Sequence, residues 1–186
     1  MGMTNSFQRS IRFATSAHAG QTRKGKPDVP YITHPLGVAL ILSRVGASED
    51  VIVAGILHDT VEDSGGKITL DDISREFGVT VAELVDHVTE KDKLLSWEER
   101  KKEALAHIYE MPHDALLLKS ADVLYNLNDL LADLAETGEE VWSRFGSPKE
   151  KQIAHHNNLA EALASVWPEN PLLGEIGKTI EILNCY

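Results

Sequence analysis

The sequence predicts an all-α protein, folded as one compact bundle of about 8–10 helices over residues 1–186. Apolar residues recur with the 3.6-residue spacing of a helix in nearly every segment, whereas alternating runs of β-branched and aromatic residues are scarce. A length of 186 residues is usual for one domain, and 42% hydrophobic with 25% charged residues is typical of globular chains. The chain can therefore bury one helical core.

Apolar spacing and turn residues define the segments of the first half of the chain. Residues 5–19 form a first helix, and 20–33 contains two glycines, two prolines and a cationic cluster, which predicts a loop. Helices are expected at 35–45 and 48–62, and Gly65-Gly66 ends the second of them. Because the second helix begins almost wholly apolar, we expect it to be central and buried.

Capping residues mark the helices of the second half. Thr69 is an N-cap, Gly78 ends the short helix that follows it, and Ser96 with Glu99 forms a capping box. Pro112 stops one helix and the next begins near Asp114. The expected segments are helices at about 69–77, 79–89, 96–111, 114–136, 147–166 and 172–183, a connector at 91–95 and a loop at 138–146.

Charge and cysteine content exclude several classes of protein. The 18 Lys and Arg residues face 29 Asp and Glu residues, so the net charge of −11 argues against nucleic-acid and membrane-surface partners. A single cysteine, Cys185, cannot support a disulfide framework or a cysteine zinc site, and this fits a reducing cytoplasm. No apolar run approaches the roughly 20 residues that span a bilayer. We expect a cytoplasmic protein, and the oligomeric state stays open.

Ionisable residues gather in the segment expected to be a buried helix. His58 and Asp59 follow the apolar run VIVAGIL, where their burial is costly unless a metal ion compensates it. Glu62 and Asp63 come one turn later, so helical spacing places Glu62 near His58 and Asp63 near Asp59. The alternative interpretation is a helix end with scattered charges emerging into solvent.

Two further polar residues occupy similar apolar settings. His34 opens an apolar helix, and Asp122 lies inside the apolar stretch LLLKSADVLYNL. Together with His58 and Asp59 they offer two imidazoles and two carboxylates, a set that suits one Mn²⁺, Fe²⁺, Co²⁺ or Zn²⁺ ion. Asn126 lies one turn after Asp122 on the same face, where its amide could hold a ligand.

Five segments occur in an order that is specific to one family. They are AHAGQTRKGK at 17–26, YITHP at 31–35, AGILHDTVED at 54–63, WEERKK at 97–102 and KSADVLYNL at 119–127. With them the chain resembles the HD superfamily of metal-dependent phosphohydrolases, specifically the hydrolase part of the bifunctional RelA/SpoT enzymes and the stand-alone small alarmone hydrolases. The resemblance covers most of the chain and implies a helical HD-type hydrolase domain.

The resemblance also implies the metal and its chemistry. It implies one metal, commonly Mn²⁺, that is held by four residues: His34, His58, Asp59 and Asp122. Glu62 and Asp63 match the pair that orients or deprotonates the attacking water and helps with proton transfer. The implied reaction removes the 3′-pyrophosphate of ppGpp or pppGpp to give GDP or GTP and pyrophosphate.

Matches outside the metal ligands imply a nucleotide substrate. Arg23 and Lys24 match positions that contact the base and phosphates, and Tyr31 and Asn126 match further pocket positions. His18 lies in the first matched segment, and either support of neighbouring residues or substrate contact is compatible with its position.

The chain departs from the family pattern beside the expected metal aspartate. Val123 stands where relatives generally carry Arg or Lys. Tyr125 stands where many bifunctional members have His, although small hydrolases often have Tyr there. Resemblance to the wider group of small hydrolases allows two alternatives, hydrolysis of the adenosine alarmones (p)ppApp or of the 2′-phosphate of NADPH. The departure at Val123 allows a third, a catalytically silent nucleotide-binding HD domain. We expect no synthetase activity.

Overall fold

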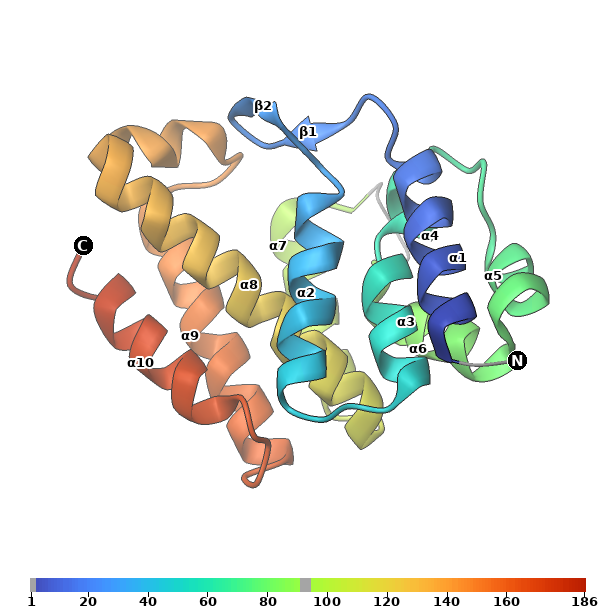
Figure 1. Ribbon diagram of the computed structural model, residues 1–186. Coiled ribbons are helices and arrows are strands. Elements are labelled where there is room, and N and C mark those ends of the chain that lie inside the picture. The colour runs from blue at the N-terminus through green and yellow to red at the C-terminus, as the bar shows by residue number, and fades with distance from the viewer. Residues whose placement is uncertain (1–2, 91–94) are drawn as a thin grey trace. The chain divides into compact units, whose positions relative to one another are not determined.

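The computed structural model describes residues 3–90 and 95–186 and confirms the predicted helical fold (Figure 1). The chain divides into two compact units, Met1–Lys91 and Asp92–Tyr186, and each unit has its own helices. The connector predicted at 91–95 falls mainly on 91–94, outside the described residues. One hydrolase domain over 1–186 stays a prediction.

A set of short helices and one hairpin make up the first unit. They are α1 (Met3–Ala17), β1 (Thr22–Arg23), β2 (Lys26–Pro30), α2 (Thr33–Arg44), α3 (Glu49–Leu57), α4 (Thr60–Asp63), α5 (Leu70–Phe77) and α6 (Val79–Val88). Helix α3 packs against α1, α2 and α6, and Figure 1 shows it between α1 and α2. Its side chains Val53 and Leu57 are 2% and 0% exposed, so the expectation of a central, buried helix is confirmed for α3. Each such side chain stabilises the fold by roughly 1.5–3 kcal/mol.

The predicted helix over 48–62 was wrong, because it is interrupted at His58 and Asp59. Helix α3 ends at Leu57 and α4 begins at Thr60. His58 Nδ1 lies 2.8 Å from the carbonyl oxygen of Gly55, and Thr60 Oγ1 donates to the carbonyl oxygen of Leu57 at 2.7 Å. Side-chain donors thus satisfy carbonyls at the end of α3, which offers the backbone an alternative to a further helical turn. The interruption leaves His58 and Asp59 between two helices.

Gly55 allows α2 and α3 to approach closely. A Cβ atom at this position would lie 2.6 Å from Leu42 Cδ1 and 3.7 Å from Ala39 Cα. We expect Gly55→Ala to destabilise the protein, because overpacking costs roughly 1–3 kcal/mol and exceeds the roughly 1 kcal/mol that alanine gains in a helix. The free energy of unfolding in urea measures this change.

Gly174 supplies the matched control for that prediction. It also lies in a helix, α10 (Leu173–Leu183), and an added Cβ would meet nothing within 4 Å. Gly174→Ala should therefore be neutral or stabilising by up to about 1 kcal/mol. Equal effects of Gly55→Ala and Gly174→Ala would contradict the close approach of α2 and α3.

A short antiparallel hairpin occupies part of the predicted loop at 20–33. Strand β1 pairs with β2, with Arg23 opposite Lys26, and Gly25 takes a φ of 76° in the turn between them. Only glycine adopts such a conformation at no steric cost. The hairpin escaped prediction because its strands are two and five residues long and β2 contains two prolines.

The second unit is built around the long helix α8 (His113–Thr137), which packs against α9 (Lys149–Val166) and α10. Figure 1 shows α8 running alongside these two helices. The unit also contains α7 (Trp97–Ile108) and the 3₁₀-helix η1 (Gly138–Arg144), which occupies most of the predicted loop at 138–146. The capping box expected from Ser96 and Glu99 is present at the start of α7. Within the described part of the chain, every helix is too short or too polar to cross a membrane.

Candidate metal centre

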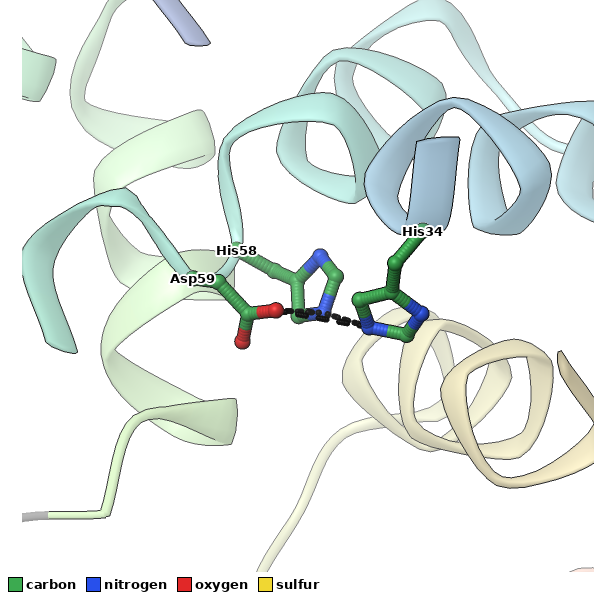
Figure 2. Close-up of side chains that lie close together, drawn as sticks. All are labelled: His34, His58 and Asp59. Carbon is green, nitrogen blue, oxygen red and sulfur yellow. Dashed lines mark hydrogen bonds and ion pairs between the residues drawn. The ribbon is translucent and has the colours of Figure 1, made fainter. Parts of the chain in front are cut away.

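Three of the four predicted metal ligands lie together in the first unit (Figure 2). His34 Nε2 is 3.1 Å from His58 Nε2, and Asp59 Oδ2 is 3.3 Å from His34 Nε2 and 3.2 Å from His58 Nε2. The first turn of α2 carries His34, whereas the interruption between α3 and α4 carries the other two. The two histidines are 2% and 4% exposed, and the Asp59 side chain is 16% exposed.

A backbone contact determines which nitrogen of His58 faces the cluster. The Nδ1 atom lies 2.8 Å from the Gly55 carbonyl oxygen, which can only accept, so Nδ1 carries the proton that it donates. In the neutral ring this leaves Nε2 with its lone pair directed at His34 and Asp59. Histidines that bind metals are oriented in this way by a carbonyl or carboxylate behind the ring.

The distances within the cluster fit a metal ion. Metal bonds of about 2.0–2.2 Å, at angles between 90° and tetrahedral, separate neighbouring ligand atoms by about 2.8–3.6 Å. The three observed separations are 3.1, 3.2 and 3.3 Å. Lone pairs that face each other at such distances repel unless a proton or a cation lies among them. Two imidazole nitrogens and a carboxylate oxygen therefore form a suitable part of a divalent transition-metal site.

The charge state of Asp59 suits a metal ligand. Burial opposes ionisation of this carboxyl, yet the electrostatic interaction with His58 and the contacts with His34 outweigh burial and hold the pKa of Asp59 well below its usual range. Asp59 is therefore ionised at any physiological pH. It supplies the negative charge that a divalent cation requires.

Tyr31 contacts the metal cluster directly. Its hydroxyl donates to Asp59 Oδ2 at 2.7 Å, a contact that the sequence did not suggest. Burial, followed by the charges of Asp59 and Asp63, raises the pKa of Tyr31 far above its usual value, so the hydroxyl stays protonated. Substrate contact by Tyr31 stays a prediction.

Glu62 and Asp63, the predicted catalytic pair, lie in the single turn of α4. Glu62 Oε2 accepts a hydrogen bond from the backbone N–H of Glu90 at 3.1 Å, which ties α4 to the end of α6. Burial raises the pKa of Glu62, and the charges of Asp59, Glu90 and Asp63 add to this effect against the hydrogen bond from Glu90. A carboxylate with a raised pKa is a better proton acceptor near neutral pH. The N–H of Asp63 donates to the Asp59 carbonyl oxygen at 2.9 Å.

Two predicted cationic contacts lie at the turn of the hairpin. Arg23 ends β1, and its guanidinium carbon is 5.6 Å from the centre of the Tyr31 ring. Lys24 follows it in the turn and is exposed. The hairpin thus places Arg23 beside a residue that contacts Asp59, although binding of a base or phosphate by either cation stays a prediction.

Asp122 and Asn126, predicted for metal and substrate, lie in α8 of the second unit. Asp122 Oδ2 accepts from Lys119 Nζ at 2.9 Å, and Asp122 Oδ1 accepts from Asn126 Nδ2 at 2.6 Å. Asn126 thus lies one turn after Asp122 on the same face, as expected, and its amide donates to the Asp122 carboxylate. The cluster of the first unit contains the other three predicted ligands, and Asp122 remains a predicted fourth one.

Sequence reasoning missed two residues of these networks. Lys119 pairs with Asp122, and its i, i+3 spacing in a helix could have indicated this ion pair. Gln21 donates from Nε2 to the Asp63 carbonyl oxygen at 2.8 Å, and nothing in its local sequence pattern indicates that contact.

Known proteins are similar to this chain in sequence. A family model described as an HD domain matches residues 10–150. The zebrafish (Danio rerio) guanosine-3′,5′-bis(diphosphate) 3′-pyrophosphohydrolase MESH1 is 45% identical over 123 residues, which are 65% of this chain and 67% of that protein. The matched region thus spans about two thirds of this relative.

Two solved structures resemble the chain over most of its length. One is of a metazoan orthologue of SpoT that hydrolyses ppGpp and plays a role in starvation responses; it covers 95% of this chain and 94% of its own, with 28% identity and a TM-score of 0.79. The other is lmo0812 of Listeria monocytogenes, with a TM-score of 0.74 and 35% identity over 82% of this chain and 99% of its own.

Proposed function

The chain belongs to the HD domain family, and on that premise we propose that it is a metal-dependent 3′-pyrophosphohydrolase of ppGpp and pppGpp. The observation that carries the proposal is the convergence of His34, His58 and Asp59 within 3.1–3.3 Å of one another. The 45% identity to a protein named for this activity supports the choice of substrate.

The proposed reaction adds water across one phosphate ester bond. The water oxygen goes to the phosphorus attached to the ribose 3′ oxygen, the bond to that oxygen breaks, and the 3′ oxygen takes up a proton. The products are GDP or GTP and pyrophosphate. A bound Mn²⁺ ion, the metal we propose, would lower the pKa of water and polarise the phosphoryl group.

The proposed role of each residue follows from its place. His34, His58 and Asp59 hold the metal, with Asp122 as fourth ligand. Glu62 takes the proton of the attacking water, because burial raises its pKa and the Glu90 amide fixes its position. Asp63 helps to transfer that proton.

The substrate carries a large negative charge, and the whole chain carries −11. Its binding therefore requires local cations. We propose that Arg23 and Lys24 contact the base and phosphates from the hairpin and that Asn126 and Tyr31 complete the pocket. The position of Arg23 beside the Tyr31 ring supports this assignment.

We propose a single hydrolase domain over 1–186. The HD domain match runs from residue 10 to residue 150 and so includes parts of both compact units. The metazoan ppGpp-hydrolysing structure covers 95% of the chain, which leaves little of these 186 residues for synthetase activity. A cytoplasmic location, and the lack of nucleic-acid and membrane partners, remain proposals from composition alone.

A substrate panel tests the proposal. Purified protein with Mn²⁺ is incubated with ppGpp, pppGpp, ppApp and NADPH, and the products are separated by ion-exchange chromatography. We expect equimolar GDP and pyrophosphate from ppGpp. Faster turnover of ppApp, or phosphate release from NADPH in place of ppGpp hydrolysis, would replace the guanosine assignment by one of these alternatives.

Binding without turnover of any substrate would support a catalytically silent HD domain. The position that departs from the family pattern bears on this alternative, since Val123 is 3% exposed and lies on the apolar face of α8. The departure therefore replaces a basic residue by a core side chain and leaves Glu62, Asp63 and the predicted ligands in place.

Metal titration tests Asp122 as the fourth ligand. Asp122→Ala should weaken Mn²⁺ binding by at least about 10–100-fold, the effect of removing a supporting residue from a metal site. Isothermal titration calorimetry on metal-free protein measures the affinity. Asp114→Ala, which removes an exposed carboxylate from the first turn of the same helix, is the control. Equal Mn²⁺ affinity of the two variants would exclude Asp122 from the coordination sphere.

A further inference from the structure

A hydrogen bond from Tyr31 reaches the carboxylate oxygen that faces both imidazoles. The Tyr31 hydroxyl donates to Asp59 Oδ2 at 2.7 Å, and the same oxygen lies 3.2 Å from His58 Nε2 and 3.3 Å from His34 Nε2. A carboxylate oxygen has two lone pairs, so it can accept from the phenol and face a cation at the same time. The hydroxyl thus restrains Asp59 in the orientation that faces the two imidazoles.

The backbone on both sides of Tyr31 is anchored as well. The N–H of Tyr31 donates to the carbonyl oxygen of Gln21 at 2.9 Å, and the N–H of His34 donates to the carbonyl oxygen of Tyr31 at 3.0 Å. Tyr31 is therefore held between the segment before the hairpin and the first turn of α2. The residue that contacts Asp59 is itself fixed to a metal ligand.

His18 supports the ring of Tyr31. The two ring centroids are 4.7 Å apart with an interplanar angle of 36°, and His18 is 4% exposed. Gln21 Nε2 donates to the Asp63 carbonyl oxygen, so Gln21 Oε1 must be the acceptor for His18 Nδ1 at 2.7 Å. This network joins the end of α1 to the backbone of Asp63, next to the Tyr31–Asp59 contact.

The Nε2 atom of His18 makes no hydrogen bond among the described residues that would explain a histidine at this position. The atom is buried as well. A buried polar atom without a partner costs stability, and such exceptions require an explanation. The ring of His18 contacts Tyr31 and, through its hydrogen bond with Gln21, connects to the backbone of Asp63.

We infer that Tyr31 is a positioning residue of the metal centre, which holds Asp59 for metal binding through its hydroxyl, and that His18 holds Tyr31 in place. This inference rests on the metal centre of the proposed function. It assigns to Tyr31 a role towards the metal that is separate from contact with the nucleotide. Residues that hydrogen-bond to metal ligands typically change metal affinity when they are replaced.

Tyr31→Phe isolates the hydroxyl, because the ring that packs on His18 is kept. We expect the affinity of metal-free protein for Mn²⁺ to fall by about 10–100-fold, as measured by isothermal titration calorimetry. At saturating Mn²⁺ the KM for ppGpp measures the separately proposed contact between Tyr31 and the nucleotide. Tyr109→Phe, which removes a hydroxyl from a 62% exposed tyrosine, should bind Mn²⁺ as the parent does.

The outcomes separate this inference from the proposed function. Parent-like Mn²⁺ affinity in Tyr31→Phe would overturn the inference and leave the metal centre intact. A raised KM for ppGpp with unchanged Mn²⁺ affinity would do the same and would assign Tyr31 to substrate binding. A parent protein that binds no Mn²⁺ would overturn the metal centre and the inference with it.

A pair of His18 variants tests the support of the ring. His18→Ala should lower Mn²⁺ affinity several-fold, whereas His18→Phe, which restores a planar ring against Tyr31, should recover most of it. Circular dichroism of both variants shows whether they keep the helical fold. Parent-like Mn²⁺ affinity in a folded His18→Ala variant would overturn the role of His18, and equal losses in both variants would overturn the role of its ring.

Discussion

Asp59→Ala should lose bound metal and nearly all ppGpp hydrolysis. Asp59 carries the negative charge of the three-residue cluster, and its Oδ2 atom lies within 3.3 Å of both imidazole nitrogens. Metal ions supply several kcal/mol of transition-state stabilisation in phosphate chemistry. Because each 1.36 kcal/mol changes the rate tenfold, we expect kcat/KM to fall by about 10³-fold or more.

Metal content and turnover measure this loss independently. Protein dialysed against Mn²⁺ and then against metal-free buffer is analysed by mass spectrometry, and pyrophosphate release from ppGpp is followed in parallel. Asp71→Ala is the control, because it removes an exposed carboxylate from the first turn of α5. Retention of Mn²⁺ by Asp59→Ala at the level of Asp71→Ala would refute the assigned cluster.

Glu62→Gln should keep the metal and lose turnover. Glutamine has the size of glutamate, and its Oε1 atom can still accept from the Glu90 amide, but it cannot take a proton from water. General bases contribute about 10²–10⁴-fold to rates, so we expect kcat to fall by that factor. Measurement of kcat at saturating Mn²⁺ and ppGpp tests this, with the exposed Glu83→Gln on α6 as control. A kcat equal to that of Glu83→Gln would remove Glu62 from the mechanism.

The pH dependence of the same variant provides a second test. The base acts in its ionised form, and burial raises the pKa of Glu62 above the ordinary value of 4.5. The kcat/KM of the parent should therefore fall as the pH decreases through this raised pKa. The residual activity of Glu62→Gln should lack that acidic limb, because glutamine does not titrate.

A rise in pH should affect the stability of the metal-free protein in the direction opposite to its effect on kcat/KM. A carboxyl whose pKa is higher in the folded than in the unfolded state binds protons more readily when folded, so stability decreases as the pH rises through that window. At pH 7–8 the metal-free parent therefore carries the cost of an ionised, buried Glu62. Glu62→Gln lacks this cost, so its metal-free form should unfold at the same or a higher temperature.

Local signals in the sequence were sufficient for most helices. Thr69 was predicted as an N-cap and Ser96 with Glu99 as a capping box; both are present, and Thr69 also forms a capping box with Asp72. The placement of Asp122 and Asn126 on one helix face followed equally from helical spacing, although the hydrogen bond between them was not predicted. Such features depend on neighbours along the chain, which is the information that periodicity and capping rules use.

Features that depend on the fold escaped those rules. His34 and His58 are 24 positions apart, and spacing along the chain cannot bring them together. Their grouping was predicted from apolar setting, from the chemistry of metal ligands and from the family resemblance. The break after Leu57 was missed because helical spacing was extended from the apolar run through residues 58–62. The observed end depends on side-chain donors to the Gly55 and Leu57 carbonyls.

The contact between Tyr31 and Asp59 also could not be predicted from spacing along the chain. The residues lie 28 positions apart, and the sequence indicated only a pocket position for Tyr31. The family resemblance identified the correct neighbourhood without the hydrogen bond. Tyr31 directly follows strand β2 of the hairpin, which the loop prediction for 20–33 did not contain.

Gly55 has two roles, one through its lack of a side chain and one through its carbonyl oxygen. Its missing side chain admits Leu42 from α2, and its carbonyl oxygen accepts from the imidazole of His58. A substitution that pushes the two helices apart would therefore also tilt the ring that presents its nitrogen to the cation. The unfolding temperature and the amount of bound metal should therefore decrease together as the residue at position 55 becomes larger, although the substituted side chain does not contact the metal.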